Sequence, residues 1–120
     1  MKGIGNDIVE IERIRLSIER HGHHFLDRLF TQKEQDYCLK YTDSAPHFAG
    51  RFAAKEAIVK ALGTGFGSEV QWRDIAIHAD TKGKPIVILS PSIKERFQNP
   101  TILVSISHSD EYATAIAVYF

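Results

Sequence analysis

Two side chains in one helical run could together bind a metal ion and a phosphate group. Within residues 51–65, Glu56 and Lys60 stand four residues apart, so they lie on the same stripe of a helix. Arg51 and Lys55 form a second line beside that stripe, and alanines fill much of the rest. One carboxylate among three cations on such a helix indicates a metal ion together with a phosphate ligand. The alternative is a surface helix on which a Glu56–Lys60 ion pair contributes only about 0.3–0.5 kcal/mol.

A second carboxylate, Asp7, lies near the end of an expected N-terminal strand, just after Gly5. Mg2+ is a hard cation that proteins often bind through one or two carboxylates, with water and substrate phosphate oxygens completing its coordination. Asp7 and Glu56 could supply those carboxylates, and Lys60, one turn beyond Glu56, could neutralise a phosphate charge. An aspartate that only caps the end of the strand is the alternative interpretation of Asp7.

The histidines offer weaker indications of chemistry. Ser107 and His108 end a strand, but neighbours in a strand point to opposite faces, and no G-x-S-x-G turn surrounds the serine. The pattern therefore argues against a hydrolase pair and leaves His108 as a phosphate or hydroxyl partner, or as a buried histidine. Because His21, His23 and His24 have no cysteine or suitably spaced partner, we expect a solvated turn there rather than a metal site.

The composition fits a single domain spanning residues 1–120. The 15 basic and 15 acidic residues balance, which argues against a strong electrostatic field for nucleic acids or membranes. The apolar runs are shorter than a membrane span, and the N-terminal residues lack the apolar core of a signal peptide. The one cysteine, Cys38, cannot form an intrachain disulfide, so we expect a cytoplasmic protein with Cys38 packed in a helix.

Periodicity and capping residues divide the first half of the chain into one strand and four helical segments. The expected strand covers residues 3–10, and the expected helices cover residues 11–20, 23–30, 32–41 and a long segment that begins near Ser44 and Pro46 and ends at Leu62. Gly22 and Gly63 end two of these helices, and Thr31 with Glu34 matches a capping box.

The second half of the chain changes to mostly alternating patterns. Strands are expected over residues 72–79, 85–89, 101–107 and 112–119, with a turn at residues 80–84 and a short helix from Ser90-Pro91 to near Gln98. Helices thus cluster early in the chain and strands cluster late. That order favours an α+β fold in which helices pack on a largely antiparallel sheet.

Three segments taken together resemble one protein family. They are Gly3-Ile4-Gly5-Asn6-Asp7-Ile8-Val9, the stretch of residues 50–65 that holds Glu56 and Lys60, and Val104-Ser105-Ile106-Ser107-His108-Ser109. In order and overall length, the chain is similar to the bacterial holo-[acyl-carrier-protein] synthases of the phosphopantetheinyl transferase superfamily. The central segment is the most specific of the three, and Asn6 stands where aliphatic residues are common.

The resemblance implies an enzyme with a phosphopantetheinyl transferase-like fold that acts in fatty acid biosynthesis. Such an enzyme moves the phosphopantetheine group of coenzyme A onto a serine hydroxyl of an apo acyl carrier protein, and adenosine bisphosphate leaves. The resemblance also implies Mg2+ bound by Asp7 and Glu56, with Lys60 facing the pyrophosphate. The general base is open between Glu56, Asp7 and a metal-bound water.

Further residues acquire expected roles through the same resemblance. Arg51 and His108 would contact the phosphate-rich nucleoside end of coenzyme A, and the turn Gly83-Lys84-Pro85 would lie near the adenine. The basic face of the first helix, with Arg13 and Arg20, would dock the acidic carrier protein.

The resemblance finally implies a homotrimer with its sites between subunits. Arg51 and His108 could then serve a site that is completed by Asp7 of the partner subunit. Two other functions differ in what they require. A non-catalytic module that binds Mg2+ or a nucleotide would not depend on a carrier protein. A metal-dependent phosphohydrolase would transfer to water and release free phosphopantetheine, but such enzymes usually need more metal-directed carboxylates or histidines than this chain offers.

Overall fold

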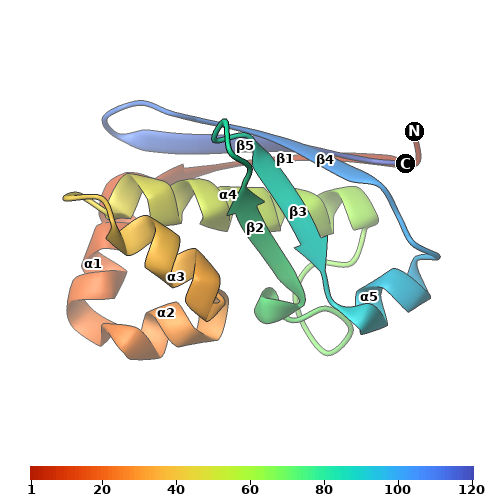
Figure 1. Ribbon diagram of the computed structural model, residues 1–120, viewed down its shortest axis with the longest axis horizontal. Coiled ribbons are helices and arrows are strands. Elements are labelled where there is room, and N and C mark those ends of the chain that lie inside the picture. The colour runs from red at the N-terminus through yellow and green to blue at the C-terminus, as the bar shows by residue number, and fades with distance from the viewer.

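A computed structural model describes all 120 residues and shows a helical layer packed against antiparallel strands (Figure 1). The elements in chain order are β1 (Gly3–Glu10), α1 (Ile11–His21), α2 (His23–Leu29), α3 (Gln32–Leu39), α4 (Ala45–Leu62), a 3-10 turn (Trp72–Asp74), β2 (Ile75–Ala79), β3 (Pro85–Leu89), α5 (Pro91–Arg96), β4 (Ile102–His108) and β5 (Tyr112–Tyr119). The α+β prediction is confirmed. None of the helices has both the length and the apolar character needed to cross a membrane.

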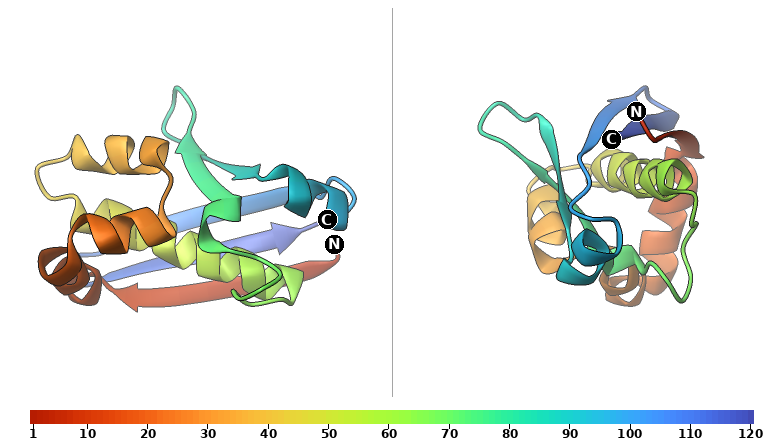
Figure 2. Two further views of the ribbon diagram at one scale, coloured as in Figure 1. Left: turned by 90° about the horizontal axis from the view of Figure 1, so that it is seen from below. Right: turned by 90° about the vertical axis from the view of Figure 1, so that its right-hand side faces the viewer.

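The strands form two antiparallel sheets rather than one. The larger sheet has the order β1-β5-β4, with the first and last strands of the chain paired side by side from Gly3↔Tyr119 to Glu10↔Tyr112. The smaller sheet is the β2-β3 hairpin, whose connecting turn projects away from the rest of the molecule (Figure 2). Helix α4 runs along one face of the larger sheet (Figure 1).

Strand β1 lies unusually close to α4. A Cβ atom added to Gly5 would lie 2.1 Å from the carbonyl oxygen of Ala57, and one added to Gly3 would lie 2.0 Å from that of Ala61. Because no real side chain tolerates such distances, only glycine permits the strand to pack directly on the helix backbone. Residues at odd positions of β1 face the helix, so this contact places Asp7 beside α4.

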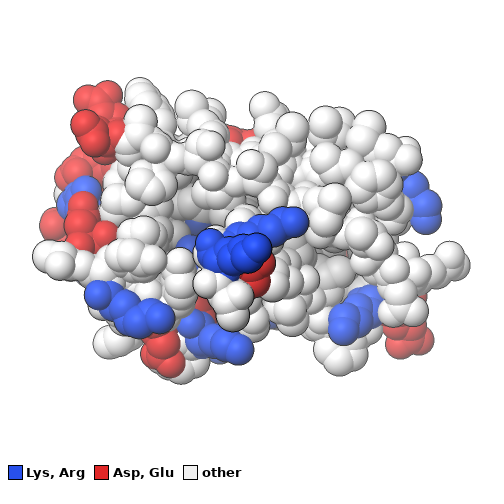
Figure 3. All heavy atoms as spheres, turned by 45° about the horizontal axis from the view of Figure 1, so that its top comes forward, with Lys and Arg blue, Asp and Glu red and all other residues white.

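The two faces of the larger sheet differ in character. The inner face carries alanines of β5, which are buried under α4. The outer face exposes apolar side chains of all three strands, including Ile4, Ile8, Leu103, Tyr112 and Ile116. In Figure 3, most of the upper half of the view is free of charged groups, which lie mainly at both ends, at the centre and in the lower half of the view. Exposed apolar area of this extent indicates a surface for association.

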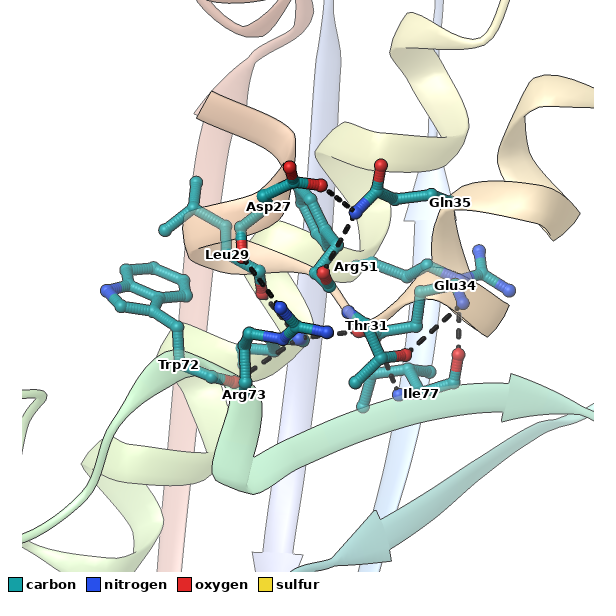
Figure 4. Close-up of polar contacts among 11 residues, drawn as sticks. Asp27, Leu29, Thr31, Glu34, Gln35, Arg51, Trp72, Arg73 and Ile77 are labelled. Atoms are coloured by element: carbon teal, nitrogen blue, oxygen red, sulfur yellow. Dashed lines mark hydrogen bonds and ion pairs between the residues drawn. The ribbon is translucent and has the colours of Figure 1, made fainter. Parts of the chain in front are cut away.

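A buried ion pair joins the helical layer to the hairpin. The ammonium of Lys55, with a fully buried side chain, donates to Glu34 Oε1 at 2.7 Å and to the carbonyl oxygens of Leu29 and Trp72. Glu34 also accepts from the backbone N–H groups of Thr31 and Ile77, between which it lies in Figure 4. Burial lowers the pKa of Lys55, and Glu34 opposes that shift.

Most element ends agree with the sequence-based expectations. Gly63, with φ of +81°, ends α4, and both halves of the Thr31–Glu34 capping box are formed. The strand expected at residues 72–79 begins only at Ile75, since Trp72 to Asp74 form a 3-10 turn and Trp72 stacks on Phe66 with ring centroids 3.9 Å apart. Helix α3 ends two residues earlier than expected, at Leu39.

Candidate functional site

Asp7 and Lys60 meet where β1 crosses α4. The Lys60 ammonium lies 3.1 Å from Asp7 Oδ1 and donates to the carbonyl oxygen of Asn6 at 2.9 Å. The Asp7 side chain is 16% exposed and that of Lys60 is 51% exposed, so the contact opens to solvent on the lysine side. Lys60 therefore pairs with the strand carboxylate, and the Glu56–Lys60 ion pair considered as an alternative is not found.

Glu56 is the second carboxylate at this crossing. Burial raises the pKa of Glu56, the nearby charge of Asp7 raises it further, and Lys60 partly opposes both effects. No protein hydrogen bond satisfies the Glu56 carboxylate, in contrast to Asp7. We refer to Asp7, Glu56 and Lys60 as the crossing site.

The crossing site has the donor set of a weakly enclosed Mg2+ site. No group of three or more histidine, cysteine, aspartate or glutamate side chains could hold a metal here, so the chain offers two carboxylates at most. Two carboxylates that repel one another gain from a bound divalent cation, and Mg2+ is commonly held this way with water and phosphate oxygens. The two carboxylates therefore fit a Mg2+ ion.

Arg51 and His108 form a second polar region, at the N-terminal part of α4. Arg51 is 7% exposed; its Nε donates to the carbonyl oxygen of Ile77 at 3.2 Å, and its guanidinium lies 4.2 Å from the Tyr37 ring centroid. No carboxylate lies within ion-pair distance of Arg51. His108 is exposed at the end of β4, and its ring centroid lies 6.0 Å from that of His47. We refer to Arg51, His108 and His47 as the cationic cluster.

Grooves lie on both sides of the β2-β3 hairpin. One, of about 620 Å³, lies between α3 and the hairpin and is lined by Tyr37, Lys40 and Ile86, among others. The other, of about 540 Å³, lies between the hairpin and β4 and is lined by Lys84 and Pro85. The predicted turn Gly83-Lys84-Pro85 thus borders a groove. Asp80 orders that turn by accepting from the backbone N–H groups of Lys82 and Lys84.

The crossing site and the cationic cluster lie on different sides of the chain. Arg51 and Glu56 are five residues apart, which separates them by about 140° around the helix. Asp7 and His108 lie on β1 and β4, the two edge strands of the larger sheet. One chain therefore brings together Asp7, Glu56 and Lys60 but does not join them to Arg51 and His108.

Arg13 and Arg20 are exposed on α1 and make no ion pair within the chain. Seven residues bring a helix back to nearly the same direction, so the two guanidinium groups share one face. Leu16 is 38% exposed on the same helix, near Arg13 and Arg20. Arg15 differs, because it is held by Glu12 and Asp43. The basic face of α1 is thus available to an acidic partner.

Strand register separates the side chains of Ser107 and His108. Ser107 is opposite Thr114 on the exposed face of the sheet, whereas His108 is opposite the buried Ala113, so the two side chains leave opposite faces. His21, His23 and His24 are solvent-exposed and form no metal-ligand group.

Two polar residues of these regions were absent from the sequence-based site. His47 precedes Arg51 by one helical turn, and this i,i+4 spacing could have indicated it. Glu34 was assigned only to a capping box, and nothing in local spacing indicates that its other contacts reach Lys55 and Ile77.

Residues 3–117 match the family model described as the 4'-phosphopantetheinyl transferase superfamily. The chain is 56% identical over 117 residues to the holo-[acyl-carrier-protein] synthase of Protochlamydia amoebophila, covering 98% of this chain and 96% of that one. It is 52% identical over 118 residues to the synthase of Chlamydia felis, again covering 98% and 96% of the two chains.

Solved structures show the same similarity. The holo-[acyl-carrier-protein] synthase of Helicobacter pylori, in complex with coenzyme A, is 37% identical with a TM-score of 0.90, and the match covers 98% of this chain and 99% of that one. The Bacillus anthracis synthase, in complex with coenzyme A (3',5'-ADP), is 39% identical with a TM-score of 0.85, covering 98% and 95%.

Proposed function

This chain belongs to the 4'-phosphopantetheinyl transferase superfamily, and from its geometry we propose how it transfers phosphopantetheine from coenzyme A to a serine of apo acyl carrier protein. The observation that carries the proposal is the crossing site. Asp7 and Glu56 come together there from β1 and α4, which are distant in sequence. Lys60 contacts the Asp7 carboxylate and is itself half exposed to solvent.

Asp7 and Glu56 are the residues that hold Mg2+ in this proposal. When bound, the ion supplies positive charge to the pyrophosphate of coenzyme A and aligns it for displacement. The support is the pair of carboxylates brought together at the crossing site, where burial, and then the charge of Asp7, raises the pKa of Glu56.

Lys60 supplies a positive charge that stabilises the negative charge on the leaving group. The serine oxygen of the carrier protein attacks the phosphorus that bears the pantetheine, and the bond from this phosphorus to the bridging oxygen breaks. Adenosine bisphosphate then departs with the extra negative charge. Lys60, whose ammonium is half exposed and held only by Asp7 and the Asn6 carbonyl, can turn toward that charge.

We assign the proton of the attacking serine to Glu56. Its carboxylate has no hydrogen-bond partner within the protein, so an oxygen is free to accept a proton. Asp7 is less suited to the role, because the Lys60 ammonium already neutralises it at 3.1 Å.

In this proposal the cationic cluster binds the nucleoside end of coenzyme A. Arg51 and His108 bind the phosphate of the nucleoside, and the turn Gly83-Lys84-Pro85 borders the groove that takes the adenine. Arg51 suits this role because it is nearly buried, rigidly held and without a carboxylate partner.

The separation of the two regions supports a homotrimer with sites between subunits. Arg51 and His108 of one subunit would meet Asp7 of the partner subunit, and the exposed apolar face of the larger sheet would be covered on assembly. Arg13 and Arg20 would dock the acidic carrier protein beside the same site. We place the reaction in the cytoplasm, where the buried free thiol of Cys38 would stay reduced.

Intact mass of an apo acyl carrier protein tests the proposal, after incubation with this protein, coenzyme A and Mg2+, with EDTA as control. The expected result is a gain of one phosphopantetheine that EDTA abolishes. Binding of coenzyme A without any mass gain would point to a non-catalytic binding module. Release of free phosphopantetheine into solution would point to a phosphohydrolase.

A further inference from the structure

His47 is a member of the cationic cluster that has no role in the function described above. It lies in the first turn of α4, four residues before Arg51, so the two side chains share a face of the helix. Its ring stacks on Tyr41 with centroids 3.6 Å apart and planes 16° apart, and it meets the His108 ring edge-on at 6.0 Å. Tyr41 thus holds the imidazole in a fixed orientation beside His108.

The charges around His47 are mostly positive. His108 faces it from β4 and Arg51 from α4, while Asp43 and Tyr41 face it from the segment between α3 and α4. Asp43 is the one acidic group among them, and Arg15 of α1 already binds its carboxylate. Tyr37 of α3 is engaged with the Tyr41 hydroxyl.

This arrangement disfavours the charged form of His47. Burial lowers the pKa of His47, and the charges of His108 and Arg51 lower it further, while Asp43 has a weaker opposing effect. Arg51 is more than nine-tenths buried and has no carboxylate partner, so the cluster is poised for an external anion. A phosphate dianion placed among these groups would reverse the sign of the field that His47 experiences.

We propose that His47 is a third ligand, with Arg51 and His108, of the phosphate monoester on the nucleoside of coenzyme A, and that His47 takes up a proton as this phosphate binds. The inference rests on the proposed function, which places the nucleoside end of coenzyme A at the cationic cluster. It makes His47 a specificity residue that distinguishes coenzyme A from its analogue without the 3'-phosphate. It also makes binding of coenzyme A tighter at lower pH, since the proton is taken up with the ligand.

The test compares the unmodified protein with two variants. His47→Phe keeps the stacked ring, and His47→Gln keeps a hydrogen-bonding group. Calorimetry at about pH 6.5 measures the affinity for coenzyme A and for dephospho-coenzyme A. Two buffers of different ionisation enthalpy report the protons taken up. His24→Phe, at an exposed histidine of α2, is the matched control.

Both His47 variants are expected to bind coenzyme A about tenfold more weakly, the effect of losing one charged hydrogen bond, and to take up fewer protons. Binding of dephospho-coenzyme A is expected to stay unchanged, and His24→Phe is expected to match the unmodified protein. Equal loss for both ligands would overturn the proposal, as would wild-type proton uptake in both variants.

The same measurements distinguish a failure of the proposed transferase function from a failure of the His47 inference alone. An unmodified protein that neither binds coenzyme A nor modifies the carrier protein would remove the proposed function and this inference together. An unmodified protein that does both, with His47 variants indistinguishable from it, would remove this inference alone.

Discussion

Lys55 and Glu56 are neighbours in sequence but belong to two charged groups with opposite properties. Lys55 points into the core, where it pairs with Glu34, and both side chains are fully buried. Glu56 belongs to the crossing site, where the Lys60 side chain is half exposed and Glu56 itself has no hydrogen-bond partner in the protein. Helix α4 therefore contributes to two ion pairs. The Lys55–Glu34 pair is buried, and we call it the closed pair; the Lys60–Asp7 pair of the crossing site is open to solvent.

The difference shows how the same residue types serve structure or ligand binding. Glu34 receives two backbone N–H groups and the Lys55 ammonium, and Lys55 reaches two carbonyl oxygens besides. Buried charges satisfied this fully hold the surrounding elements in place but offer nothing to a ligand. At the crossing site the carboxylates repel one another, and a cation would relieve that repulsion.

Breaking the closed pair should have the largest effect. Lys55→Met leaves the Glu34 carboxylate buried without its cation, which should lower the free energy of unfolding by about 3–5 kcal/mol. Urea denaturation followed by circular dichroism measures this loss. The double variant Lys55→Met with Glu34→Leu should recover part of it, but not all, because the N–H groups of Thr31 and Ile77 lose their acceptor.

The Cys38 thiol gives an independent reading of the same change. Burial raises the pKa of Cys38 to about 12, so alkylation of the native protein should be slow. Faster alkylation is expected in Lys55→Met. If Lys55→Met were as stable and as slowly alkylated as the unmodified protein, the buried Lys55–Glu34 pair would not contribute to stability.

Removing the Glu56 carboxylate from the crossing site should lower activity and leave the fold intact. Glu56→Gln should reduce transfer to the carrier protein by about 100-fold or more, because a neutral amide is a poor Mg2+ ligand and a poor base. Glu95→Gln, on the exposed side of α5, is the matched control. Normal transfer by Glu56→Gln in the mass assay would contradict its assignment as ligand and base.

A smaller effect is expected outside both groups. Arg13→Glu should raise the KM for the carrier protein by about tenfold through charge reversal, with little change in kcat. Lys94→Glu, on α5, should leave both constants unchanged. A large loss of kcat with an unchanged KM would count against docking on α1.

The smallest expected effect is that of Glu56, in the crossing site, on the thermal stability of the protein and on how that stability depends on pH. Because the pKa of Glu56 is raised in the folded chain, its ionised form is less favourable there than in the unfolded chain. Glu56→Gln should therefore slightly raise the melting temperature at pH 7. This gain should vanish at about pH 4, where Glu56 is protonated in both the native and the unfolded protein. A melting temperature lowered at pH 7 would contradict the repulsion between Asp7 and Glu56.

The sequence predicted elements better than it predicted the directions of side chains. Gly22, Gly63 and the Thr31 capping box marked helix ends correctly, because these signals act through local backbone geometry. The strand was predicted to begin at Trp72 but begins at Ile75, because Trp72 stacks on Phe66 and does not pair with another strand. The split into two sheets also depends on long-range packing.

The crossing site was predictable only in part. Helical spacing placed Glu56 and Lys60 on one stripe. The same spacing did not show that Arg51 and Lys55 are buried, because α4 has buried residues around most of its circumference rather than on one face. The approach of Asp7 depends on Gly5 touching the backbone at Ala57, a contact that no residue spacing reveals.

The pairing of β1 with β5 has a consequence for synthesis of the protein. Strand β1, which carries Asp7, is synthesised well before residues 112–119, with which it pairs. The nascent chain therefore lacks the partner strand that fixes Asp7 until those residues have been made. A product truncated before β5 would carry every residue of the crossing site, but Asp7 would lack the strand that holds its own strand in place.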